Sequence, residues 1–188
     1  MTQTHSASPE HRDFLLIALR VIVWAVIGII AFAFIMVAIA APAALIFRDS
    51  MAAELAAEGL ATVDTALILQ VAAILAAVAA LLALAIHFFR LLLKIIDTVA
   101  QGDPFSPDNA ERLTRMGWVA VIGQLGALLL GIFALMIVET HADLAAAAEI
   151  DVDVGLDGGG LILILVLFVL ARVFRHGAAM REDLEGTV

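Results

Sequence analysis

GDPFSPDNAERL, residues 102–113, separates two long apolar stretches of the chain. Gly102 can adopt the left-handed conformation that ends a helix, and Asp103-Pro104 is typical of a turn. Ser106 is a favourable N-cap, Pro107 suits the first position of a new helix, and Asp108 places negative charge at its positive end. The segment therefore predicts a short helix-to-helix corner that reverses the chain, and we assign this corner to residues 90–116.

Both sides of the corner show helical periodicity. Before the corner, one helix face is apolar and the opposite face carries lysine and aspartate, as expected for an amphipathic helix that continues beyond the membrane. The apolar face consists of Leu92, Ile95, Ile96 and Val99. After it, Glu111 and Arg115 have the i, i+4 spacing of an ion pair. The inward face of this second helix is predicted to consist of Ala110, Leu113 and Met116.

Composition identifies a membrane protein. Hydrophobic residues make up 64% of the 188 residues, against about 45–50% in soluble domains. A membrane-spanning helix needs about 20 apolar residues. The sequence predicts an all-α, polytopic membrane domain with four transmembrane helices at 14–41, 66–89, 117–138 and 158–174. Pro42 is expected to kink or end the first helix. That first stretch is too long for a cleaved signal peptide, which is the competing interpretation.

Charge predicts the orientation of the four spans. All but one of the ten lysines and arginines fall in the N-terminus, the corner and the C-terminus, whereas Arg48 alone falls in an outer loop. Such an asymmetry places both termini and the corner in the cytoplasm. The net charge of −9 then lies entirely in the outer loops, and it argues against nucleic acid as a direct ligand.

Small residues predict which helices pack closely. Gly123, Ala127 and Gly131 are spaced by four residues on the third span, which leaves one face of that helix nearly flat. Alanines recur in the second span at Ala72, Ala76 and Ala80. Because small residues let helices approach each other in lipid, the second and third spans are expected to form a tight pair.

The residues needed for enzyme chemistry do not occur in a usable pattern. No serine lies within a span, no pair of aspartates lies within the bilayer, and cysteine is absent. The phosphate-binding, zinc-protease and nucleophile-elbow motifs are also absent from the sequence. The chain is therefore expected to be no enzyme and to need no cofactor.

The outer loops carry acidic residues with a weak resemblance to a metal site. A divalent cation could be bound by Glu139, His141, Asp143, Asp151 and Asp153, although the ligand pattern is incomplete. The alternative is a solvated acidic loop. GLDGGG, residues 155–160, is interpreted as a flexible lead into the fourth span.

Two segments resemble a known family. FRLLLKIIDTVAQGDPFSPDNAERLTRMGW, residues 89–118, and ARVFRHGAAMREDLEGTV, residues 171–188, are similar to the domain of unknown function 2975 family of bacterial membrane proteins. The resemblance implies a four-helix protein of the bacterial inner membrane, often encoded beside a small helix-turn-helix regulator, with no known catalytic activity. The family pattern falls on Gly102, Pro104, Phe105, Asn109, Leu113, Gly117, Phe174, Gly177 and Val188.

Two function classes remain open. The favoured one is a membrane partner or sensor for a soluble cytoplasmic regulator, with docking residues Phe105, Pro104, Asn109, Arg112 and Arg175. The alternative is a transporter, channel or lipid-binding protein, which should place polar residues near the bilayer midplane. Gln70 and Gln124 are the span residues that could line an inner cavity, and they are better explained by hydrogen bonds between helices. The sequence does not indicate an oligomeric state.

Overall fold

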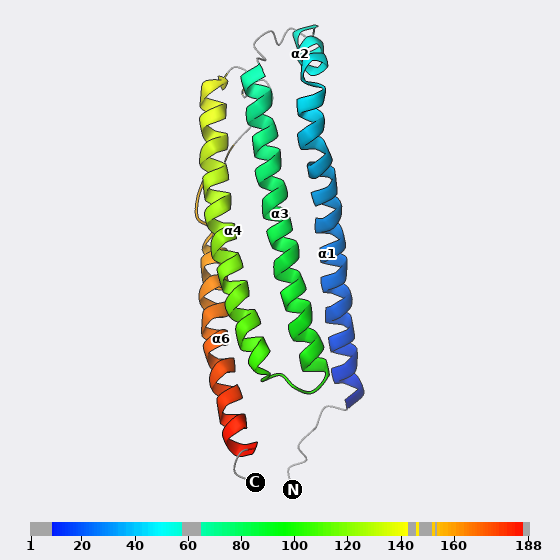
Figure 1. The fold of residues 1–188 in the computed structure, drawn as a ribbon, viewed down its shortest axis with the longest axis vertical. Coiled ribbons are helices and arrows are strands. Elements are labelled where there is room, and N and C mark those ends of the chain that lie inside the picture. The colour runs from blue at the N-terminus through cyan, green and yellow to red at the C-terminus, as the bar shows by residue number, and fades with distance from the viewer. Residues whose placement is uncertain (1–8, 58–64, 143–145, 147–151, 153, 186–188) are drawn as a thin grey trace. The chain divides into compact units, whose positions relative to one another are not determined.

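The computed structural model describes residues 9–57, 65–142, 146, 152 and 154–185. In this part of the chain it contains five helices and no strand (Figure 1). The helices are α1 (Pro9–Ile46), α2 (Arg48–Ala57), α3 (Thr65–Ala100), α4 (Pro107–Thr140) and α6 (Gly158–Glu185). Four of them, α1, α3, α4 and α6, are long and apolar enough to cross a membrane. The all-helical fold with four candidate spans is therefore confirmed.

Three of the helices extend well beyond the predicted spans. Helix α3 continues past Phe89 to Ala100, and α4 begins at Pro107, before the predicted start of the third span. Helix α6 continues past Phe174 to Glu185. The prediction that the second span leads into an amphipathic helix is confirmed, because α3 has no break at Arg90.

The first span differs from its prediction at Pro42. This proline does not end the helix, since α1 runs through it to Ile46. Helical hydrogen bonding also continues across the junction with α2, where the Phe47 amide donates to the Ala43 carbonyl at 2.9 Å and the Met51 amide to the Phe47 carbonyl at 2.9 Å. An interior proline removes only one backbone donor, so the surrounding turns can keep the helix intact. Helix α2 was not predicted.

The residues group by their contacts into two units. The corner unit contains the chain up to Ile29, residues 86–120 and the chain from Ile162, and the second unit contains residues 30–85 and 121–161. Each of the four long helices contributes residues to both units. The start of α1, the corner and the end of α6 thus belong to one unit.

The core of the corner unit consists of two apolar clusters. One joins α3, α4 and α6 through Leu91, Ile95, Leu113, Met116, Leu167 and Ala171. The other joins α1 to α3 through Val23, Ile27, Leu93 and Ile96. Ala110, Leu113 and Met116 are all buried, which confirms the predicted inward face of α4.

In the second unit, α3 and α4 approach each other closely at a glycine that the sequence analysis did not select. A Cβ atom on Gly126 would lie 2.9 Å from Leu81 Cδ2, whereas one on Gly123 would lie 3.7 Å from Leu84 Cδ2. Ala127 is exposed and Gly131 is half-buried. The closest approach therefore falls on Gly126, and the packing role of Gly123, Ala127 and Gly131 as a set stays a prediction.

Local chemistry forms the corner as the sequence predicts. Gly102 has a φ of 83°, its amide donates to the Val99 carbonyl at 3.1 Å, and the Asp103 amide donates to the Thr98 carbonyl at 3.1 Å. These two bonds form a Schellman motif that satisfies the last carbonyls of α3. Helix α4 then starts at Pro107. The reversal of the chain thus takes six residues, 101–106, between the two helices.

Candidate functional site at the corner and the C-terminal helix

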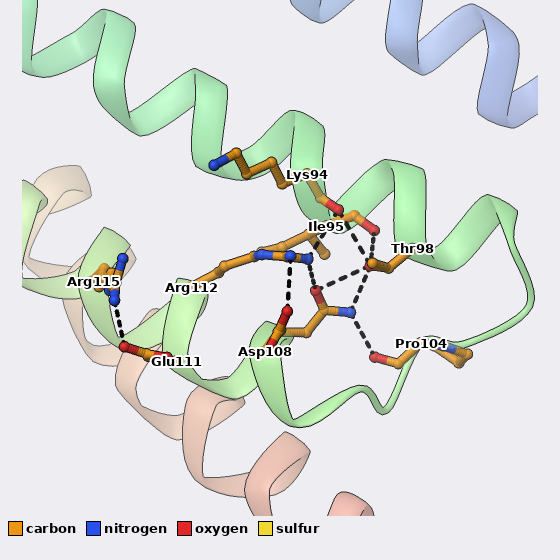
Figure 2. Close-up of polar contacts among 9 residues, drawn as sticks. Lys94, Ile95, Thr98, Pro104, Asp108, Glu111, Arg112 and Arg115 are labelled. Carbon is orange, nitrogen blue, oxygen red and sulfur yellow. Dashed lines mark hydrogen bonds and ion pairs between the residues drawn. The ribbon is translucent and has the colours of Figure 1, made fainter.

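Asn109 joins the two helices of the corner from the inside. It has no exposed surface. Its Nδ2 donates to Thr98 Oγ1 at 2.8 Å and to the Pro104 carbonyl at 3.0 Å, and Thr98 Oγ1 in turn lies 2.8 Å from the Ile95 carbonyl (Figure 2). One amide thus holds the end of α3, the turn and the start of α4. Asn109 was predicted to contact a partner, and its burial corrects this: the side chain supports the corner from within.

Arg112 reinforces the same junction. Its Nη1 donates to Asn109 Oδ1 at 2.9 Å and to the Lys94 carbonyl at 3.2 Å, and its Nη2 donates to Asp108 Oδ2 at 3.2 Å. Figure 2 shows the guanidinium lying between α3 and α4. The Arg112 side chain is only 20% exposed, so most of its donors are already used within the corner. Its predicted role in partner docking stays a prediction.

Phe105 joins the corner to α6. Its ring centroid lies 5.4 Å from that of Phe174, at an angle of 46°. A Cβ atom on Gly177 would lie 2.7 Å from Phe105 Cδ1, so the absence of a side chain at Gly177 makes room for the ring. Phe105 therefore packs on the C-terminal segment of α6 that begins at Phe174.

Glycine makes room for an aromatic ring at a second position. A Cβ atom on Gly117 would lie 3.0 Å from the Phe168 ring, and Phe168 also contacts Trp118 edge-on at 5.7 Å between centroids. Gly117 and Gly177 both belong to the residues on which the family resemblance rests. Both glycines therefore have the same physical role, because each leaves space for a phenylalanine ring to pack against the helix backbone.

Ion pairs tie the corner to both of its neighbours. Arg181 of α6 lies 2.6 Å from Asp103 Oδ1 in the turn, and Arg20 of α1 lies 3.2 Å from Asp97 Oδ1 of α3. All four side chains are partly exposed, so each pair contributes at most about 1 kcal/mol. The pairs select one arrangement of α1, the corner and α6 and add little stability. The predicted pair of Glu111 and Arg115 is also formed.

Three hollows lie beside α6 in the corner unit. The first, of about 620 Å³, is lined by Thr114, Phe168, Ala171, Arg172, Arg175, His176 and Ala179. The second, of about 610 Å³, is lined by Phe105, Arg172, Val173, His176, Gly177 and Met180. The third, of about 470 Å³, is lined by Pro107, Ala110, Glu111, Thr114, Arg175, Ala178, Ala179 and Glu182. Phe105 and Arg175, two of the predicted docking residues, are thus both at open surfaces.

The predicted metal ligands are not brought together in the described part of the chain. Asp143, Asp151 and Asp153 lie outside the described residues. Glu139 and His141 are described, and His141 Nδ1 lies 3.2 Å from the Ile137 carbonyl of its own helix. Among the described residues no group of three acidic, histidine or cysteine side chains could hold a metal ion. The metal site stays a prediction.

The segment before α6 is a helix cap. Asp157 Oδ1 accepts from the Gly159 amide at 3.2 Å, and Asp157 Oδ2 accepts from the Gly160 amide at 2.7 Å. This corrects the interpretation of residues 155–160 as only a flexible lead. Gln124 Nε2 donates to the Asp157 carbonyl at 3.2 Å, so it binds the start of α6. Gln70 Oε1 is buried without a hydrogen-bond partner among the described residues.

Several contacts that build the corner were not predicted from the sequence. Thr98 bonds to Asn109 and Asp103 pairs with Arg181, and neither contact follows from local sequence. Gly177 had a detectable signal, because it belongs to the family pattern at the C-terminus. Its contact with Phe105 could not be read from spacing.

Four helices that are long and apolar enough to cross a membrane define a multi-pass α-helical membrane protein. Residues 51–188 match the model of the family described as protein of unknown function DUF2975. The chain belongs to this family. Neither the curated proteins nor the solved structures gave a match.

Proposed function

We propose that this chain is a non-enzymatic protein of the bacterial inner membrane that acts as a membrane partner or sensor for a soluble cytoplasmic regulator. The cation asymmetry supports an orientation with both termini and the corner in the cytoplasm. The start of α1, the corner and the end of α6 belong to one contact unit, as this orientation requires. The family resemblance, with its frequent neighbouring helix-turn-helix regulator, supplies the kind of partner.

The main support for this proposal is that the Phe105 side chain is exposed and yet held in one position. Its ring is held against Phe174 and Gly177, yet the residue keeps 42% of its surface exposed. The corner beneath it is fixed by the buried amide of Asn109. An aromatic side chain that is both exposed and preorganised loses little entropy on binding, which is the property of an interface anchor.

The hollow beside Phe105 indicates what a partner would present. Phe105, Val173 and Met180 give it apolar walls, Arg172 adds a cationic group, and His176 adds an imidazole. An apolar side chain of the partner would pack against the apolar walls, and a neighbouring carboxylate would pair with Arg172. A surface helix with an acidic and apolar face would supply this combination.

Phe105→Ala should weaken binding of the regulator. We expect a loss of about 2 kcal/mol, or roughly thirtyfold in Kd, because truncation removes the exposed part of the anchor. The measurement is binding of a purified helix-turn-helix regulator, of the kind often encoded beside members of this family, to the full-length protein in detergent. Phe47→Ala is the matched control, since Phe47 is an exposed phenylalanine of the second unit.

Unchanged binding by the Phe105→Ala protein, with a folded corner, would remove the main support for a docking surface there. Equal losses of binding affinity in the Phe105→Ala and Phe47→Ala proteins would also contradict the proposal, because only the residue that contacts the partner should matter.

A further inference from the structure

We propose that the hollow between α4 and α6, lined by Arg172, Arg175, His176, Thr114, Phe168 and Ala171, binds the phosphate group of an anionic phospholipid. This hollow shares Arg172 and His176 with the hollow beside Phe105, and its other lining residues do not line that hollow. The hollow measures about 620 Å³, which is enough for a headgroup phosphate and its glycerol.

Within the described part of the chain, no carboxylate lines this hollow to neutralise its charge. Arg172 makes no ion pair or hydrogen bond within the described residues, and Arg175 has only the Thr114 hydroxyl, at 3.4 Å. Several other arginines of the corner unit lie against carboxylates, namely Arg20, Arg112, Arg115 and Arg181. Two guanidinium groups without carboxylate partners form a fitting site for the oxygens of a phosphate.

The surroundings of the hollow match a lipid better than a free anion. Phe168 and Ala171 give it an apolar floor. Trp118, 58% exposed, contacts Phe168 from α4, and aromatic rings of this kind favour headgroup depth. One and two turns before Arg172, α6 exposes Val169 and Leu165. Acyl chains can cover that apolar face while the phosphate stays beside the arginines.

The acidic residues nearest to this hollow line the third hollow, which adjoins it. Glu111 and Glu182 line the third hollow, which shares Thr114 and Arg175 with this one. Glu111 is already paired with Arg115. A phosphate would therefore sit on the Arg172 side, away from Glu182. Arg172 is the residue on which we expect the specificity to rest.

The test uses the purified full-length protein, delipidated in a neutral detergent, without any regulator present. It is titrated separately with phosphatidylglycerol, phosphatidylcholine and inorganic phosphate, and retained ligand is measured by native mass spectrometry. We expect phosphatidylglycerol to bind in preference to the other two. Arg172→Gln with Arg175→Gln should weaken its affinity about tenfold. Arg172→Lys with Arg175→Lys should recover most of it.

The control is Arg48→Gln with Arg90→Gln, which removes the same charge from exposed positions that do not line the hollow. It should leave phosphatidylglycerol binding unchanged. Equal weakening in both glutamine double variants would overturn the site, since the effect would then be net charge. Equal binding of phosphatidylcholine, or binding of inorganic phosphate alone, would overturn the assignment to an anionic lipid.

Discussion

Replacing Asn109 by alanine should lower the free energy of unfolding by about 3 kcal/mol, the largest effect that we expect from a single truncation in this chain. The change leaves the Pro104 carbonyl and the Arg112 guanidinium without their buried partner. It also removes the hydrogen bond that Asn109 Nδ2 donates to Thr98 Oγ1, which holds α4 to α3. A buried polar group that loses its partner costs about 1–3 kcal/mol, and several are affected at once.

The measurement is thermal unfolding of the purified protein in detergent, followed by circular dichroism. Glu111→Gln is the control, because it neutralises a carboxylate of the same helix, and the ion pair of Glu111 with Arg115 is exposed. Its effect should stay within about 0.5 kcal/mol. If Asn109→Ala were as mild as Glu111→Gln, the corner would not depend on its buried amide.

Gly177→Leu should cost about 3 kcal/mol, because any side chain at this position collides with the Phe105 ring. A Cβ atom alone would lie 2.7 Å from Phe105 Cδ1. The ring must then leave Phe174, which separates the corner from α6. Gly28→Leu is the control, since a Cβ atom on Gly28 has nothing within 4 Å.

A double variant identifies the cause of that loss. In the Phe105→Ala background the cavity left by the ring can accept the new side chain, so Gly177→Leu should cost much less than it does alone. Thermal unfolding of the four proteins in this cycle gives the interaction energy. An equal cost of Gly177→Leu in both backgrounds would show that the collision with Phe105 is not responsible.

The parts of the fold that were predicted from sequence depend on local chemistry. Gly102 ends α3 because only a left-handed residue completes its last hydrogen bonds, and Pro107 begins α4 because its missing amide is not needed there. Ala110, Leu113 and Met116 could be placed on the inner face from helical periodicity alone.

The parts that were missed depend on contacts between distant residues. Asn109 was expected to contact a partner, and its burial and its hydrogen bond to Thr98 show that it is internal. Gly126 and Gly123 lie on the same helix, and the partner Leu81 determines which one is closest. The cap by Asp157 is different, because an aspartate directly before a helix is a local signal and could have been used.

The regulator surface requires the corner to face the cytoplasm, so the most direct test is the sidedness of the corner. The chain has no cysteine, which allows single cysteines to be introduced without background. Gln101→Cys places an exposed thiol at the corner, and Glu54→Cys places one on α2 in the second unit. Both variants would be treated with a membrane-impermeant thiol reagent that reaches only the outer face of the inner membrane. The account predicts labelling at residue 54 and none at residue 101 until the membrane is permeabilised. Labelling at residue 101 in sealed membranes, with residue 54 protected, would contradict it.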